Sequence, residues 1–152
     1  MKGVRSLRMT IESSLENVSL VGNALRGILE NEPGPRQDIP LVELAVCEAV
    51  NNAIIHSYGR VEGHLVEVDV SFKDGRLAVV VSDMGRGFES FPDPLPAIPD
   101  SDRPEAFPLG GWGLRIMGTV METVAYASDS GRNRLTMTRR WEQPVANGTG
   151  LT

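Results

Sequence analysis

The sequence predicts an α+β domain built from one sheet and a few helices. Three observations support this: a long apolar helix at 41–58, an alternating β-hairpin at 65–81, and two further strands within 123–141. The 152 residues are 41% apolar and 23% charged, which suits one globular domain with its own core. We expect this domain to span residues 1–142, followed by a disordered tail at 143–152.

The amino-terminal part predicts a strand followed by a helix. Residues Val4 to Ile11 alternate in polarity, as a strand with two different faces does. Ser13 with Glu16 three residues later forms a capping-box pattern that opens a helix. Pro33-Gly34-Pro35 ends this helix.

The central helix, Leu41 to Tyr58, carries polar residues at a regular interval. These residues are Glu48, Asn52 and His56. Steps of four residues advance about 400° around a helix, so the three side chains line one edge. The residues around them are apolar on every side, which predicts a buried helix. Buried acidic and amide groups need partners, and a metal ion with a polyanionic ligand would supply them.

The two ends of this helix are marked by suitable residues. Asp38 is the expected N-cap, Pro40 falls in the first turn, and Gly59 can supply a left-handed exit. Cys47 lies in the apolar part, where a free thiol packs as a small hydrophobic group, so we expect it in the core and not as a nucleophile.

The next segment predicts the sheet. Strands at 65–72 and 77–81 are joined by the turn residues Asp74-Gly75. The second strand is apolar on both faces, which predicts a place in the middle of a sheet covered by helices.

A long loop separates this hairpin from the last elements. Residues 88–109 hold six prolines, five acidic residues and one arginine, and loops of this length usually bind a ligand or move. A helix is expected from Gly111, then a strand at Thr123 to Ser128, a turn at 129–131 and a last strand reaching Trp141.

Two glycine-rich motifs flank the long loop. Asp83-Met84-Gly85-Arg86-Gly87 places an acceptor beside backbone that a flat ring can approach, although it could also be a simple strand-exit turn. Gly110-Gly111-Trp112-Gly113-Leu114 opens a helix whose free amides can bind an anion, although glycines at a helix start can also serve packing.

Composition excludes several functions. The net charge of −5 provides no basic stripe, so we expect no direct nucleic-acid ligand. We find no apolar run of 18 residues and no signal peptide, which predicts a cytoplasmic protein that does not enter a membrane. Walker A and eukaryotic-type kinase motifs are absent from the sequence.

The order of the motifs resembles the three nucleotide-binding boxes of the GHKL, or Bergerat-fold, ATPases. The resemblance spans about residues 41–118. Within that superfamily, the wording of residues 48–56 and the pattern Gly131-x-Asn133-x-Leu135-x-Met137 are similar to the RsbW-type anti-sigma factor serine kinases. The resemblance implies a single histidine-kinase-like ATPase domain that is a two-layer α/β sandwich. Its sheet would be mixed but mostly antiparallel, with helices on one face and an ATP lid at about 88–109.

The resemblance also implies roles for the central residues. Glu48 would be the general base that accepts the proton of an attacking hydroxyl group. Asn52 would hold Mg²⁺ through its amide oxygen, and His56 would face the phosphates of ATP. Asp83 would accept the exocyclic amine of adenine.

The same resemblance implies roles for the glycines of both motifs. Gly85 and Gly87 would let the nucleotide approach, and the amides of Gly111, Trp112, Gly113 and Leu114 would bind the phosphates. Arg103 in the lid either reaches the γ-phosphate or is solvated, and Arg115 is expected on the surface.

The function implied is that of an ATP-dependent serine-protein kinase and anti-sigma factor. It would phosphorylate a STAS-domain anti-anti-sigma partner and sequester a sigma factor, as a homodimer. One alternative is an anti-sigma module that binds ATP without turnover. Another is a stand-alone histidine-kinase catalytic domain, although His56 and His64, the two histidines of the chain, are poorly placed as phosphoacceptors.

Overall fold

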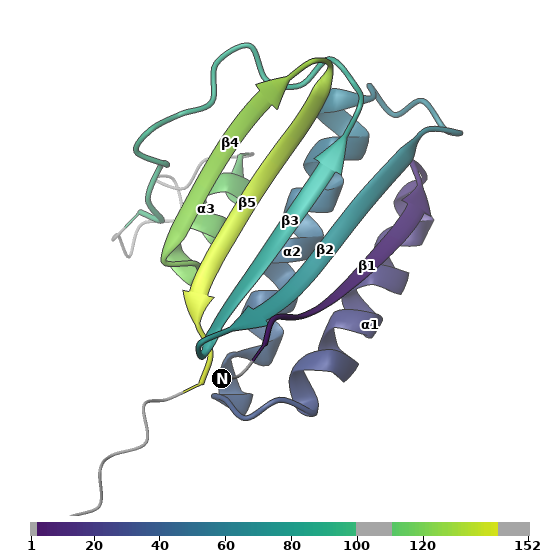
Figure 1. The fold of residues 1–152 in the computed structure, drawn as a ribbon. Coiled ribbons are helices and arrows are strands. Elements are labelled where there is room, and N and C mark those ends of the chain that lie inside the picture. The colour runs from purple at the N-terminus through teal and green to yellow at the C-terminus, as the bar shows by residue number, and fades with distance from the viewer. Residues whose placement is uncertain (1–2, 100–110, 143–152) are drawn as a thin grey trace, which may run out of the picture.

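The protein is one antiparallel sheet with a layer of helices on one of its faces (Figure 1). The computed structural model describes residues 3–99 and 111–142. The main elements in chain order are β1 (Arg5–Glu12), α1 (Val18–Glu30), α2 (Ile39–Asn52), β2 (Leu65–Lys73), β3 (Arg76–Asp83), α3 (Trp112–Val120), β4 (Thr123–Asp129) and β5 (Arg132–Arg140).

The sheet has the strand order β1-β2-β3-β5-β4. Every pairing among these strands is antiparallel, so the predicted α+β sandwich is confirmed, whereas the expected parallel component of the sheet is not found in the described strands. The turn at Asp74-Gly75 has φ values of 51° and 74°, and that at Ser130-Gly131 has 52° and 79°. Both turns lie where the sequence predicts them.

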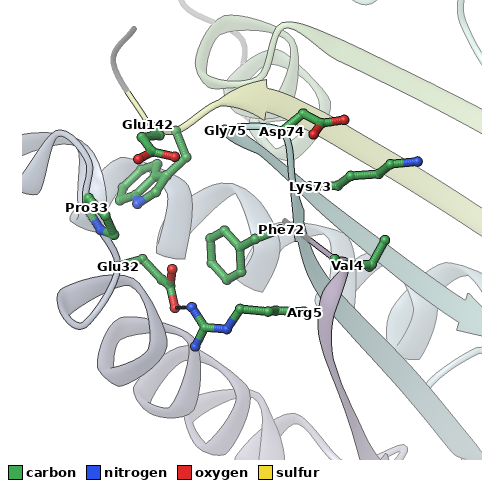
Figure 2. Close-up of a pocket in the computed structure, with 11 residues that line it drawn as sticks. Val4, Arg5, Glu32, Pro33, Phe72, Lys73, Asp74, Gly75 and Glu142 are labelled. Atoms are coloured by element: carbon green, nitrogen blue, oxygen red, sulfur yellow. Dashed lines mark ion pairs between the residues drawn. The ribbon is translucent and has the colours of Figure 1, made fainter. Parts of the chain in front are cut away.

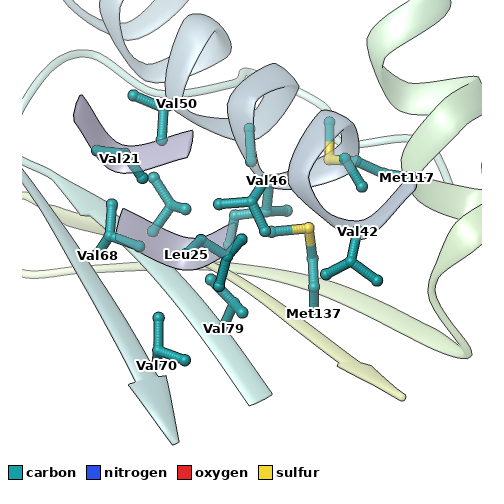
Figure 3. Close-up of a cluster of buried hydrophobic side chains, with 14 of the residues drawn as sticks. Val21, Leu25, Val42, Val46, Val50, Val68, Val70, Val79, Met117 and Met137 are labelled. Carbon is teal, nitrogen blue, oxygen red and sulfur yellow. The ribbon is translucent and has the colours of Figure 1, made fainter. Parts of the chain in front are cut away.

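The core fills the space between the sheet and the helices (Figure 3). Val42, Val46 and Val50 of α2 point into it and meet Leu25 of α1 and Met117 of α3. β3 is the middle strand, as predicted, but its residues alternate between buried and half-buried. Within the described residues the helices therefore cover one face of the sheet, and the half-buried Ala78 and Val80 belong to its other face.

The predicted capping box at Ser13 is wrong. The Ser13 hydroxyl donates to the Val61 carbonyl (2.7 Å) and accepts from the His64 amide (3.0 Å), so it binds the loop before β2. α1 instead begins at Val18 after a short 3₁₀ turn, with Asn17 at its N-cap. A buried hydroxyl takes the partners that the tertiary structure offers it, and here those partners are distant in the sequence.

The residues expected at the ends of α2 lie where the sequence predicts them, but Asp38 does not form the expected side-chain cap. Asp38 is at the N-cap, yet its carboxylate accepts a hydrogen bond from Arg139 (2.8 Å) and caps no amide. Pro40 lies in the first turn and Gly59 has a φ of 60°, both as predicted. Beyond Asn52 the helix widens into a π-helical segment, Ala53–Ser57.

The prediction that α2 is buried on every side is also wrong. Leu41 and Leu44 are 48% and 44% exposed. Cys47 is half-buried, with its sulfur against Gly22, and burial raises the pKa of its thiol, assisted by the carboxylates of Glu43 and Glu48.

One helical stretch in the described part of the chain, Arg36–Ser57, is long and apolar enough to cross a membrane. The expectation that no such run exists is therefore wrong. The inner face of this stretch supplies the core of the domain, and that role accounts for its apolar composition.

Truncating a core side chain should destabilise the domain. Leu25→Ala removes a fully buried side chain and should lower the free energy of unfolding by about 2–5 kcal/mol. Leu20→Ala, on the same helix but at a position 61% exposed, should change it by less than about 0.5 kcal/mol. Urea denaturation of both variants measures the difference, and equal losses would contradict this description of the core.

Candidate active site

Asp83, the last residue of β3, lies at the centre of a buried hydrogen-bond network. Its Oδ1 accepts from the amide of Gly85 (2.9 Å), the Nδ2 of Asn133 (2.8 Å) and the hydroxyl of Ser57. The side chain of Asn133 on β5 also donates to the carbonyl of Gly85 (2.9 Å). Oδ2 of Asp83 makes no hydrogen bond within residues 3–99 and 111–142.

The glycine turn after Asp83 is packed against the π-helical segment that follows α2. The carbonyl of Ser57 accepts from the amide of Arg86, and its hydroxyl accepts from the amide of Gly87, both at 3.0 Å. A Cβ at Gly85 would overlap the backbone of Ser57, and one at Gly87 would overlap Tyr126. Close packing within the protein therefore accounts for both glycines, and their role in admitting a nucleotide stays a prediction.

Tyr58 holds the same turn from its other side. Its hydroxyl donates to the carbonyl of Leu65 (2.7 Å) and accepts from the amide of Met84 (2.8 Å). Burial raises the pKa of this phenol, so it stays protonated and can keep donating at neutral pH.

A small cavity brings together three of the predicted site residues, Asn52, Asp83 and Gly87. Its volume is about 10 Å³. That is about the space that one water molecule needs. Phe88 closes it by packing edge-on against Tyr126, with 5.2 Å between the ring centroids, and Phe91 stacks on Tyr126 at 5.1 Å. A cavity of this volume is too small for a purine.

Glu48 lies beside the amino end of α3. A Cβ on Gly113 would come within 2.8 Å of its Oε2, so the absence of a side chain there lets the carboxylate approach the helix. Within the described residues the Glu48 carboxylate has no hydrogen bond or ion pair. Gly111, the N-cap of α3, has a φ of 77° that favours glycine. The amino end of α3, the positive end of its dipole, thus lies near the Glu48 carboxylate.

His56 is not part of the cavity lining. It is exposed, and its ring centroid lies 6.2 Å from that of Phe88. The π-helical turn at Ala53–Ser57 breaks the regular spacing on which the predicted edge of three polar residues depended. The contact of His56 with the phosphates of ATP therefore stays a prediction.

The remaining predicted residues lie around α3 and the loop. Leu114 packs on the core, so only its backbone can face a ligand, and Trp112 is the first residue of the helix. Arg115 does more than lie on the surface, because its guanidinium donates to the Ala97 carbonyl and so fastens the described half of the predicted lid to α3. Arg103 and residues 100–110 and 143–152 lie outside the described residues, so nothing here tests the second half of the lid or the predicted tail.

A metal ion would depend on few protein ligands. No group of three or more His, Cys, Asp or Glu in residues 3–99 and 111–142 could hold one. Asn52 offers one amide oxygen at the cavity, and Mg²⁺ typically takes one or two protein ligands, the remainder being phosphate oxygens and waters.

A more open and mainly apolar cavity lies at the opposite end of β3 (Figure 2). Its volume is about 430 Å³, and its walls include Phe72, Trp141 and the ion pair between Arg5 and Glu32. None of the predicted site residues lines it.

Sequence reasoning missed Ser57 and Tyr126 and gave Asn133 no role. Asn133 lies directly across from Asp83 in the pairing of β3 with β5, which only the sheet register reveals. The one available signal was its place in the Gly131-x-Asn133 pattern.

Comparison with known proteins decides the family. The model of the histidine kinase-like ATPase domain matches residues 11–139. The chain belongs to this family. Among its relatives is the serine-protein kinase RsbW of Staphylococcus epidermidis, which is 30% identical over 129 residues that cover 82% of this chain and 80% of the relative. The anti-sigma F factor of Pasteuria penetrans is 31% identical over 130 residues, or 83% of each chain.

A solved structure supports the same fold. The histidine kinase-like ATPase domain described here aligns with a structure of the RsbU and RsbW domains of Rv1364c from Mycobacterium tuberculosis with a TM-score of 0.64. The sequences are 21% identical, and the alignment covers 92% of this chain and 33% of that longer one.

Replacing the first glycine of the turn should damage the fold without any ligand. Gly85→Ala drives a methyl group into the backbone of Ser57 and should lower the free energy of unfolding by about 1–3 kcal/mol. Gly27→Ala in α1 meets no atom within 4 Å and should raise it by about 0.5–1 kcal/mol. Thermal melts of both variants without nucleotide test this, and an unaffected Gly85→Ala protein would show that the turn is not packed as described.

Proposed function

We propose that this protein is an ATP-dependent serine-protein kinase that also acts as an anti-sigma factor. The observation that carries the proposal is the position of Glu48, a carboxylate with no partner in the described residues that lies against the glycine-rich start of α3. A protein that only bound ATP would need no base at this point. The family and the names of its relatives support the same activity.

The cavity residues suit an adenine nucleotide once Phe88 has moved. The free Oδ2 of Asp83 would accept the adenine amine, and this preference disfavours guanine, which carries an oxygen acceptor at that position. The amides at the start of α3 would bind the phosphates. Mg²⁺ held by Asn52 and the phosphates would neutralise the charge that develops on the γ-phosphoryl group.

The reaction transfers the γ-phosphoryl group of ATP to the hydroxyl oxygen of a serine or threonine. Glu48 accepts the proton of that hydroxyl, a new oxygen–phosphorus bond forms, and ADP leaves with the electrons of the broken bond. Glu48 is half-exposed, so a side chain of another protein can reach it.

We propose that the sequestered protein is a sigma factor, which the name of the anti-sigma F factor relative supports. We propose a STAS-domain anti-anti-sigma protein as the phosphoacceptor; the serine-protein kinase relatives support a protein acceptor, and the STAS class rests on the sequence resemblance to the RsbW-type kinases. We further propose a cytoplasmic homodimer.

Removing the base should abolish transfer and spare nucleotide binding. Glu48→Gln should lower phosphate transfer from γ-labelled ATP to a STAS-domain acceptor by about 10²- to 10⁴-fold. The dissociation constant for ATP should remain within about threefold, because the uncharged amide keeps the size of the side chain. Glu16→Gln, at an exposed position, is the control. Undiminished transfer by Glu48→Gln would refute the proposed base, and tight binding of a sigma factor by a wild type that transfers nothing would favour a binding module.

Changing the proposed adenine contact should weaken ATP binding, which Glu48→Gln should leave unchanged. Asp83→Asn can keep an oxygen toward Ser57 and Asn133 while its amide nitrogen replaces the free acceptor. Loss of a charged acceptor should weaken ATP binding about 10- to 100-fold. Calorimetric titration with ATP measures the change, with Asp129→Asn at the exposed end of β4 as control. Unchanged ATP affinity in a folded Asp83→Asn protein would remove Asp83 from the site.

A further inference from the structure

We propose that the outer face of α2 next to Glu48 is the docking surface for the protein that carries the phosphoacceptor hydroxyl. This apolar patch consists of Leu41 and Leu44, and the inference rests on the proposed kinase function. The partner is a folded protein that presents a serine or threonine beside apolar side chains of its own.

The patch and the proposed base share one face of the helix. Leu44 precedes Glu48 by four residues and Leu41 by seven, which places them within about 40° of Glu48 around the axis and about 6 and 10 Å along it. The three side chains therefore form one row on a different side of the helix from Val42 and Val46, which are fully buried against the sheet.

Leu41 and Leu44 are exposed apolar side chains three residues apart on one helix, so they are neighbours on its surface. Apart from the exposed Pro40 and the half-buried Cys47, the other residues of α2 are either packed against the core or polar. The flank of α2 beside α1 is closed by the ion pair between Arg26 and Glu43, with oxygen–nitrogen distances of 2.6 and 2.8 Å. Polar side chains at 41 and 44 would cost the fold little, because both residues are nearly half exposed. An apolar centre with a charged pair at its rim is the usual composition of a protein–protein contact.

Geometry requires the acceptor protein to cover this patch. The acceptor hydroxyl must come within about 3 Å of the Glu48 carboxylate for proton transfer. A standard interface buries about 800 Å² on each partner, which is a disc of about 16 Å radius. A protein that presents its hydroxyl at the base within an interface of that size therefore lies over Leu44 and Leu41.

The test uses leucine variants of the full chain and a purified STAS-domain protein as the probe. Leu41→Gln/Leu44→Gln should raise the KM for the STAS protein about 10-fold or more, because two apolar contacts are lost. kcat and the ATP dissociation constant should stay within about twofold, since neither leucine lines the nucleotide cavity. Binding is measured separately by calorimetry with an STAS variant whose acceptor serine is replaced by alanine, and it should weaken to the same degree.

Leu20→Gln is the matched control. Leu20 is 61% exposed on α1, two residues before Gly22, which contacts Cys47 of α2. A step of two residues turns about 200° around a helix, so Leu20 faces away from α2. This variant should leave KM and STAS binding unchanged.

Each outcome decides between the proposals. An unchanged KM and unchanged STAS binding in the double variant would overturn the docking surface while leaving the kinase intact. STAS binding that depends on the patch without any phosphate transfer would keep the docking surface and refute the kinase. A double variant that loses self-association in sedimentation, with normal STAS binding, would show that the patch joins two copies of the chain and would also overturn the proposal.

Discussion

The buried hydrogen-bond network around Asp83 is the constraint on which the candidate site depends. It joins three segments that are far apart in the sequence, namely the π-helical segment after α2 through Ser57, the end of β3 through Asp83 itself, and β5 through Asn133. A buried carboxylate without donors would be costly, so these partners must be in place when the domain folds. Once these hydrogen bonds have formed, they fix the position of the glycine turn and the orientation of the Asp83 carboxylate.

α2 contributes both to the core and to the candidate site, because different faces of the helix contact different parts of the molecule. Its inner face, with Val42 and Val46, provides the core against the sheet. One edge carries Asn52 into the small cavity with Asp83. The outer face leaves Glu48 without a partner in the described residues. The apolar side chains of this helix therefore have two causes, burial on the inner face and, as we propose, docking on the outer one.

Local sequence patterns predicted the positions of the elements better than the hydrogen-bond partners of individual side chains. The hairpin turns, the middle place of β3 and the first turn at Pro40 follow from residue type and spacing, and the structure has them. Ser13 and Asp38 have the right chemistry for caps, but both bind residues brought close by the fold. The predicted row of three polar residues ended at Asn52 because a π-helical turn follows it. Hydrogen-bonding side chains go to whichever donor or acceptor is left unpaired, and sequence spacing does not reveal which one that is.

The sequence alone determined the α+β class, the antiparallel hairpins and the order of the three motifs, because these depend on hydrophobic period and on glycine chemistry within a few residues. Only the tertiary structure decided that Asn133 faces Asp83, that Gly85 and Gly87 make room for Ser57 and Tyr126, and that Phe88 closes the cavity. These contacts join segments tens of residues apart, and their geometry is set by sheet register and helix packing, which no local pattern encodes.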